Sequence, residues 1–175
     1  MVLVVTTIAG FEKSFSIIYA QFSLPPSLAV FLNRPWTILT YGFTHSLTDI
    51  WHIIFNMISL YWFGKLFIEY LGNDRLIALY ILGAIAGGIV YLSLYNSVPF
   101  FMQRANSAGM VGASGAIFAI MVGCATLLPN YTFYLMFFGP VRIKYIALIF
   151  IVVSFIGTVS ANAGGNLAQI GRAHV

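Results

Sequence analysis

A serine within a run of small residues is the first candidate for chemistry. Ser114 lies between Gly112-Ala113 and Gly115, at the start of an apolar segment long enough to be a membrane-spanning helix. The small neighbours leave its hydroxyl uncrowded, and near a helix N-terminus the dipole favours a developing negative charge. We therefore predict Ser114 as the nucleophile of a hydrolase. The same small residues could instead serve only to let two membrane helices pack closely.

His52 and Asn56 are the second candidates. They are four residues apart, so on a helix they lie on one face, one turn from each other. Both side chains donate hydrogen bonds, and losing one oxyanion donor typically costs about 2.7–4 kcal/mol of transition-state stabilisation. The alternative is a hydrogen bond between helices, which averages about 0.6 kcal/mol in membrane proteins. Thr44-His45-Ser46 could line the same mouth, although His45 fits a histidine at the membrane interface equally well.

The composition places these residues in a membrane. Hydrophobic residues make up 61% of the chain and charged residues 7%, whereas globular domains are about 25% charged. Polar side chains in lipid-length helices are costly to insert, which makes them candidates for function. A chain of 175 residues has room for five or six spans of about 20 residues each. We predict an all-α, polytopic membrane helix bundle in a single domain.

Charge and cysteine content argue against other classes of protein. The formal net charge of +4 arises from eight Lys and Arg scattered along the chain. They form no cluster that could follow a phosphate backbone, so we expect no nucleic-acid partner. The single cysteine, Cys124, lies in an apolar run without a second thiol and supports neither a disulfide nor a metal site. We expect no metal and no cofactor.

Apolar runs and their breakers predict the order of the spans. We place a partial first helix at about 1–20, an aromatic-rich connection at about 21–47, further spans at about 49–71, 76–96, 111–128 and 143–160, and a sixth from about Ala163. Gly72-Asn73-Asp74-Arg75 closes the second span as a polar turn. The connection contains Phe22, Leu24 and Trp36 among other apolar residues, which favours the membrane interface.

Alternation of the spans brings the candidate residues to one side of the membrane. The heads of the second, fourth and sixth spans must face the same surface. His52, Ser114 and position 169 can therefore meet a few residues below that surface, within reach of water.

Four segments, in this order, resemble the rhomboid family of intramembrane serine proteases. They are Arg34-Pro35-Trp36 through Phe43-Thr44-His45, His52-Ile53-Ile54-Phe55-Asn56-Met57, Gly112-Ala113-Ser114-Gly115 and Ala163-Gly164-Gly165-Asn166-Leu167-Ala168. The resemblance covers about residues 22–168. It implies a rhomboid-like six-helix core with a Ser/His dyad that cleaves transmembrane protein substrates near the surface of the lipid bilayer.

The resemblance also implies roles for individual residues. Ser114 matches the nucleophile, while His52 and Asn56 match the oxyanion donors beside the Ser114 backbone N–H. Residues 21–47 match the family's first loop, a lateral structure at the interface. We expect a multi-pass protein of a prokaryotic inner membrane.

The base expected by this resemblance is missing. A histidine should follow Ala168, but the chain has Gln169. A glutamine amide can hydrogen-bond Ser114 but cannot accept its proton near neutral pH. His174 is no substitute, because five residues further along a helix it is more than one turn deeper and off the facing side. As written, the chain is predicted to be nearly inactive.

The last six residues, 170–175, match the translation of a common sequencing adapter. We hypothesise that codon 169 combines a first base C from the gene with two adapter bases, and that the gene encodes histidine there, since histidine codons begin with C. Arg172 within a span, at about 2.5–3.5 kcal/mol on insertion scales, agrees with a foreign ending. We therefore expect one partial membrane domain at 1–169, incomplete in its first and sixth spans, with the true start upstream.

Two other functions stay open. A non-catalytic rhomboid-like protein that binds transmembrane helices would fit a genuine Gln169, but it does not need Ser114 together with His52 and Asn56. A small transporter or channel would have broken helices in matching halves, and the sequence has no internal repeat. The sequence therefore predicts an intramembrane serine endopeptidase whose base is absent from the chain as written.

Overall fold

A computed structural model describes residues 17–45, 50–103, 109–135 and 139–152. The chain divides into two compact units, Met1–Ile120 and Met121–Val175, which we describe separately. Gln169 and His174 lie outside the described residues, as do most of the predicted first helix and the predicted sixth span.

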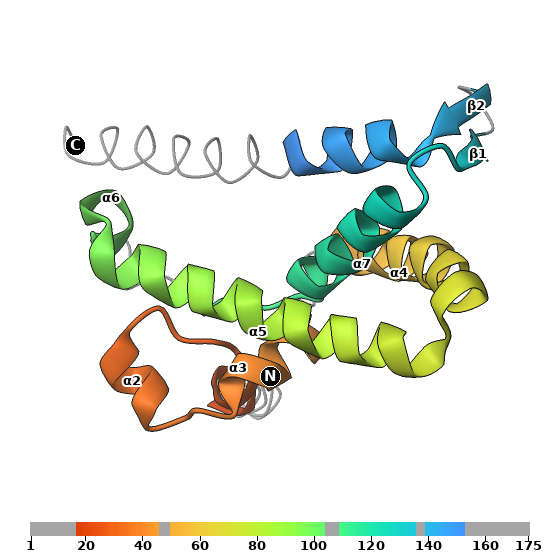
Figure 1. The fold of residues 1–175 in the computed structure, drawn as a ribbon. Coiled ribbons are helices and arrows are strands. Elements are labelled where there is room, and N and C mark those ends of the chain that lie inside the picture. Colours follow the sequence, from red (N-terminus) through yellow and green to blue (C-terminus); the bar gives the residue numbers. More distant parts are fainter. Residues whose placement is uncertain (1–16, 46–49, 104–108, 136–138, 153–175) are drawn as a thin grey trace, which may run out of the picture. The chain divides into compact units, whose positions relative to one another are not determined.

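The first unit is helical. Its elements are α2 (Leu28–Leu32), α3 (Thr37–Thr40), the 3-10 helix η1 (Tyr41–Phe43), α4 (Ile50–Leu71), α5 (Asn73–Ser97), α6 (Pro99–Met102) and the start of α7 (Ser114–Leu127). Residues 17–22 are also helical. Most of the described residues are helical, with one short hairpin in the second unit, which confirms the all-α prediction (Figure 1).

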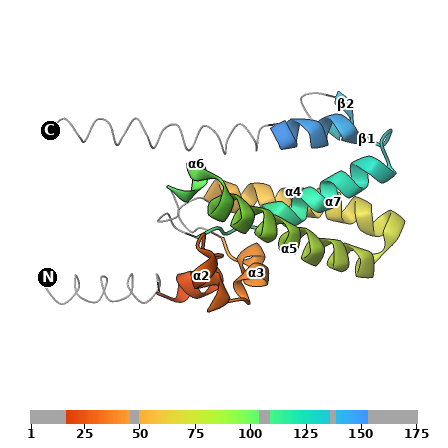
Figure 2. The ribbon, with the colours of Figure 1, turned by 60° about the vertical axis from the view of Figure 1, so that its left-hand side comes forward.

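A single residue separates α4 from α5, the predicted second and third spans. Gly72 has φ +85°, a conformation that glycine adopts at little cost. The predicted four-residue turn is therefore too long, because Asn73, Asp74 and Arg75 form the first turn of α5. Asp74 is stabilised there by the positive end of the helix dipole. The resulting tight helical hairpin packs α4 against α5 (Figure 2).

α7 begins at Ser114, later than the predicted span. Gly112 has φ +118°, which no α-helix contains, so the helix cannot start before it. Small residues then bring α7 against α5. A Cβ atom on Gly115 would lie 3.8 Å from the Cα atom of Gly87, and one on Gly83 would lie 2.6 Å from the Cβ atom of Ala119. Close helix packing, one of the two explanations for the small-residue run, therefore accounts for Gly115.

The connection between residues 23 and 45 folds onto α5. Leu24 is fully buried and forms a core cluster with Tyr41 and Leu92, although the sequence placed Leu24 at the interface. Leu24 and Met110 exchange two backbone hydrogen bonds of 2.9 and 2.8 Å. Other apolar side chains between residues 22 and 36 are exposed, and their predicted location at the membrane interface stays a prediction: Phe22, Leu28, Val30, Leu32 and Trp36.

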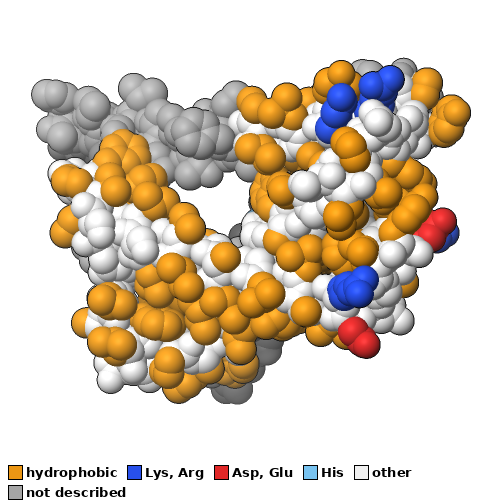
Figure 3. Space-filling view, in the orientation of Figure 1, with side chains coloured by type: hydrophobic (Ala, Val, Ile, Leu, Met, Phe, Trp, Pro, Cys, Tyr) orange, Lys and Arg blue, Asp and Glu red, His pale blue; other side chains and the backbone are white. Residues whose placement is uncertain are grey.

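The described surface carries many apolar side chains. In Figure 3 they cover much of the face that is coloured by type, and charged side chains are few. Of the helices in the described ranges, α5 alone is long and apolar enough to cross a membrane, while α7 and the helix Ile143–Val152 are apolar but shorter. Exposed apolar surface of this extent is typical of a protein that contacts lipid rather than water.

The second unit contains a hairpin that the sequence analysis did not predict. Strands β1 (Thr132–Leu135) and β2 (Gly139–Arg142) pair antiparallel, with Thr132 opposite Arg142. β1 is rich in the β-branched and aromatic residues that favour strands. A helix follows over residues 143–152, the described part of the predicted fifth span, and Ile143 at its start is fully buried.

Candidate active site

His52 and Asn56 face the backbone just ahead of Ser114. Both lie in the first two turns of α4, and their spacing of four residues puts them on one face. A Cβ atom on Gly112 would lie 2.8 Å from Nε2 of His52 and 3.9 Å from Nδ2 of Asn56. The structure therefore brings both predicted donor side chains to the small-residue run that contains Ser114.

Ser114 is the first residue of α7 and is half-buried, next to the fully buried Ala113. The first turn of a helix has backbone N–H groups without partners inside the helix, and these form its positive end. The Ser114 backbone thus lies at the electropositive end of a 14-residue helix. An oxygen that gains negative charge here would be stabilised by the helix as well as by side-chain donors.

The amide of Asn56 has a donor without a partner among the described residues. Its Nδ2 atom is buried, and within the described part of the chain it has no hydrogen-bond partner. Leaving a buried donor unsatisfied costs about 1–3 kcal/mol. Among the described residues, the Asn56 amide is therefore a donor that an oxygen acceptor could use.

His45 lies beside this pair. Its ring meets the ring of His52 edge to face, with centroids 6.0 Å apart and planes at 88°. Burial and the nearby His52 lower the pKa of His45, against a smaller opposing effect of the Phe43 backbone. Its Nε2 atom is buried without a partner among the described residues. The location next to His52 favours the site mouth over a histidine that merely sits at the interface.

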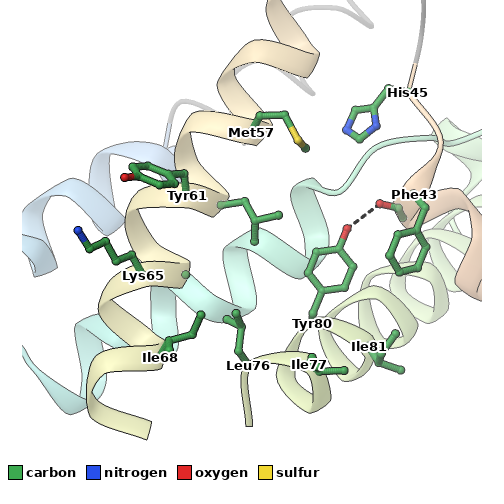
Figure 4. A pocket seen from close by; sticks show the side chains of 13 residues that line it. Phe43, His45, Met57, Tyr61, Lys65, Ile68, Leu76, Ile77, Tyr80 and Ile81 are labelled. Atoms are coloured by element: carbon green, nitrogen blue, oxygen red, sulfur yellow. Dashed lines mark hydrogen bonds between the residues drawn. The ribbon is translucent and has the colours of Figure 1, made fainter. Parts of the chain in front are cut away.

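A groove of about 760 Å³ adjoins the candidate site between α4 and α5. Figure 4 shows His45 and Phe43 at one end, with Met57 of α4 and Tyr80 of α5 along its walls. The Tyr80 hydroxyl donates a 2.8 Å hydrogen bond to the carbonyl of Gly42. The lining is almost entirely apolar and does not include Ser114, His52 or Asn56, so the groove is a neighbour of the site rather than part of it.

Two features of the site were missed by the sequence analysis. One is the positive φ of Gly112, and the other is Tyr41, whose carbonyl accepts a 3.0 Å hydrogen bond from the Gly112 N–H. Gly112 was missed because a run of small residues is explained equally well by close helix packing. Tyr41 was missed because no local sequence pattern marks it as part of the site. The predicted base position, Gln169, lies outside the described residues. Within the described ranges, no three His, Cys, Asp or Glu gather to hold a metal ion.

Comparisons with known proteins agree in pointing to one family. A family model described as Rhomboid domain matches residues 32–173. RHOMBOID-like protein 12, mitochondrial, of Arabidopsis thaliana is 38% identical over 118 residues, which cover 62% of this chain and 34% of that protein. Rhomboid protein 1, mitochondrial, of Saccharomyces cerevisiae is 33% identical over 105 residues, covering 60% and 28%.

A third relative is Rhomboid-like protein 16, chloroplastic, of Arabidopsis thaliana, 32% identical over 111 residues that cover 58% of this chain and 34% of that protein. The chain thus spans about a third of the length of the curated relatives it matches. No solved structure matches the chain.

The names of these relatives correct one prediction. The sequence analysis placed the protein in a prokaryotic inner membrane, whereas the relatives are mitochondrial and chloroplastic proteins of a plant and a yeast. The prokaryotic assignment is therefore wrong. It failed because hydrophobic composition and span length respond to the thickness of a bilayer, which does not identify the organism or the organelle.

Proposed function

Because this chain belongs to the rhomboid family, we propose that the whole protein is an intramembrane serine endopeptidase that cleaves transmembrane protein substrates. The observation that carries the proposal is the approach of His52 and Asn56 to Gly112, two residues ahead of Ser114. A binding protein has no need to hold, beside a serine at a helix N-terminus, a buried amide that has no partner among the described residues. A hydrolase needs this combination of nucleophile and donors.

In the proposed reaction, the Ser114 hydroxyl oxygen attacks the carbonyl carbon of the scissile peptide bond and loses its proton to the base. The carbonyl oxygen becomes an oxyanion, which accepts hydrogen bonds from His52, from Nδ2 of Asn56 and from the Ser114 backbone N–H. Collapse of this intermediate expels the amine, which takes up the proton, and leaves an ester on Ser114. Water then hydrolyses the ester by the same steps.

The base in this scheme is a histidine at position 169. The chain has Gln169, whose amide cannot take the proton, so we propose that the chain as written hydrolyses substrate hardly at all. Substrates follow from the chemistry of a membrane helix, whose peptide bonds are all hydrogen-bonded internally. Suitable ones unwind near the membrane surface, through Gly, Pro or polar residues.

The location we propose is a membrane of a mitochondrion or chloroplast. It is supported by the relatives from a plant and a yeast, which are named as mitochondrial and chloroplastic proteins. A fusion of the whole protein to a fluorescent protein would localise it directly. Fluorescence confined to the plasma membrane or endoplasmic reticulum would contradict this location.

A second function is favoured by one observation, the glutamine at position 169. If the gene encodes glutamine there, the protein would be a non-catalytic member of the family that binds transmembrane helices without cleaving them. The two proposals differ in whether a covalent ester forms on Ser114.

The deciding experiment begins with the gene. Codon 169 is sequenced from independent genomic template, and the whole protein is reconstituted in proteoliposomes with a transmembrane reporter that fluoresces on cleavage. We expect a histidine codon and cleavage that disappears in Ser114→Ala. A genuine glutamine codon, with no cleavage even after Gln169→His, would overturn the protease proposal and leave helix binding as the function.

A further inference from the structure

Tyr41 connects the candidate site to the frame of the helix bundle. Its backbone carbonyl accepts the 3.0 Å hydrogen bond from the Gly112 N–H. Gly112 in turn lies next to His52, because a Cβ atom added to Gly112 would be 2.8 Å from the His52 Nε2 atom. The position of the Tyr41 carbonyl therefore affects where the backbone ahead of Ser114 lies.

The side chain of Tyr41 is itself held firmly. It is 2% exposed, and its hydroxyl donates a 2.6 Å hydrogen bond to the carbonyl of Ala84, in the middle of α5. The hydroxyl lies in a slot that two glycines leave open. A Cβ atom on Gly87 would lie 3.0 Å from this oxygen, and one on Gly115 would lie 3.5 Å from it. One side chain thus contacts α5 and the residue that follows Ser114.

Gly112 is held by its neighbours and not by a side chain of its own. Its φ of +118° is a conformation that glycine adopts at little cost, so contacts with the surroundings decide where this backbone lies. The neighbouring Leu24–Met110 hydrogen bonds, 2.9 and 2.8 Å, hold the same segment two residues earlier. Tyr41 supplies the hydrogen bond at Gly112 itself and links it to α5.

We infer that Tyr41 is a positioning residue, which sets the Gly112–Ser114 backbone relative to His52 and Asn56 through its hydroxyl anchor on Ala84. The inference deepens the proposed protease function and rests on it for its kinetic consequence. Catalytic donors must be held to a fraction of an ångström, and a misplacement of about 1 Å can cost about 100-fold in rate. The anchor therefore acts on the chemical step more than on substrate binding.

The first test compares two tyrosines in the whole protein with histidine at position 169. Tyr41→Phe removes the hydroxyl that bonds Ala84. Tyr80→Phe is the matched control, because Tyr80 also ties α5 to the connection, through a 2.8 Å bond to Gly42, but the Gly42 carbonyl does not bond the Gly112 segment. We expect Tyr41→Phe to lower kcat roughly 10-fold with KM unchanged, and Tyr80→Phe to change kcat less than about twofold.

A double-mutant cycle tests the same contact from α5. Gly87→Ala places a methyl group 3.0 Å from the Tyr41 hydroxyl and should lower kcat by displacing it. In Tyr41→Phe the displaced atom is already absent, so the double variant should be no slower than Tyr41→Phe alone. If the effects on kcat simply multiply, the methyl group does not act through the hydroxyl and the inference is wrong.

Amide hydrogen exchange tests the role of Tyr41 without depending on protease activity. In the 175-residue chain in bicelles, peptides covering residues 109–117 should exchange faster in Tyr41→Phe and not in Tyr80→Phe. If the wild-type whole protein cleaves nothing, the protease proposal fails and exchange alone decides the role of Tyr41. The inference is overturned if residues 109–117 exchange equally fast in Tyr41→Phe and Tyr80→Phe. It is also overturned if the two variants lose kcat equally and lose thermal stability equally, because Tyr41 would then contribute only packing.

Discussion

The space between Gly112 and His52 is too small for a side chain. A Cβ atom on Gly112 would lie 2.8 Å from the His52 Nε2 atom, closer than real Cβ atoms approach other heavy atoms. The backbone makes the same demand, because φ is +118° at this residue. The backbone conformation thus favours glycine where the chain passes the candidate oxyanion donors, and a side chain here would also displace the His52 ring.

Gly112→Ala should therefore lower the free energy of unfolding by about 1–3 kcal/mol, through backbone strain together with displacement of His52. Unfolding in detergent micelles, followed by circular dichroism, measures this loss. The matched control is Gly64→Ala on α4, whose new Cβ atom would have its nearest neighbour at 3.8 Å. Alanine in a helix interior stabilises it by about 0.5–1 kcal/mol relative to glycine. Similar unfolding free energies for the two variants would contradict the crowding described at Gly112.

Local sequence pattern predicted the elements of the site better than their assembly. The apolar run of α4 and the spacing of His52 and Asn56 were sufficient to place both donors on one helix face. The alternation of spans predicted that this face and Ser114 lie on the same side of the membrane, but it did not predict the close approach to Gly112. The folding of the connection onto α5 depends on pairs such as Tyr41 and Ala84, 43 residues apart. No local periodicity encodes a contact at that separation.

Smaller errors have local causes. The start of α5 was placed too late, because Asn73 and Asp74 favour turns and helix first turns alike. The β1–β2 hairpin was missed because its first strand is short, apolar and aromatic. Hydropathy alone cannot distinguish such a segment from the end of a neighbouring helix. Gln169 remains the predicted position of the base, outside the described residues.

The Asn56 donor, which has no partner among the described residues, predicts a conflict between stability and activity. Asn56→Leu removes the buried Nδ2 atom, which has no partner in the described ranges, and should raise the free energy of unfolding by about 1–3 kcal/mol. In the whole protein the same substitution should lower kcat by about 100-fold to 1,000-fold, as loss of an oxyanion donor does. Reporter cleavage in proteoliposomes and unfolding in micelles measure the two effects.

Asn96→Leu is the control for this substitution. The Asn96 amide donates to the carbonyls of Pro26 and Leu92 and accepts from the Leu28 N–H. Since these bonds are all lost, Asn96→Leu should destabilise the fold. A loss of stability in Asn56→Leu of the same size as in Asn96→Leu would mean that the Asn56 amide is satisfied in the folded protein.

Gly83 sets the spacing between α5 and α7. A Cβ atom there would lie 2.6 Å from the Cβ atom of Ala119 and 3.0 Å from the Cα atom of Ala116. Neither atom can be moved by a side-chain rotation, so Gly83→Ala should lower the free energy of unfolding by about 1–3 kcal/mol, as overpacking does. Adding Ala119→Gly removes the nearer of the two clashing atoms and should recover part of the loss. If the double variant is the sum of two destabilised singles, the helices are not in contact at these residues.

Tyr41 predicts a loss of stability at alkaline pH. Its pKa is raised from 10.0 to about 12, mainly by burial, which would take the phenolate out of contact with water, and also by the nearby Tyr80. Below pH 10 the phenol is protonated in both the folded and the unfolded chain, and this contribution to stability is fully present. As pH rises from about 10 to about 12, the unfolded chain ionises while the folded chain does not, so the unfolding free energy falls by about 2–3 kcal/mol.

Tyr41→Phe isolates this contribution, because every other tyrosine is the same in the two proteins. The wild-type chain should be more stable than the variant at pH 8, and its advantage should shrink between pH 10 and 12. Unfolding free energies of both chains in micelles at pH 8, 10, 11 and 12 measure the difference. A difference that stays constant over this range would mean that Tyr41 titrates alike in both states and is open to water, which would contradict its anchor on Ala84.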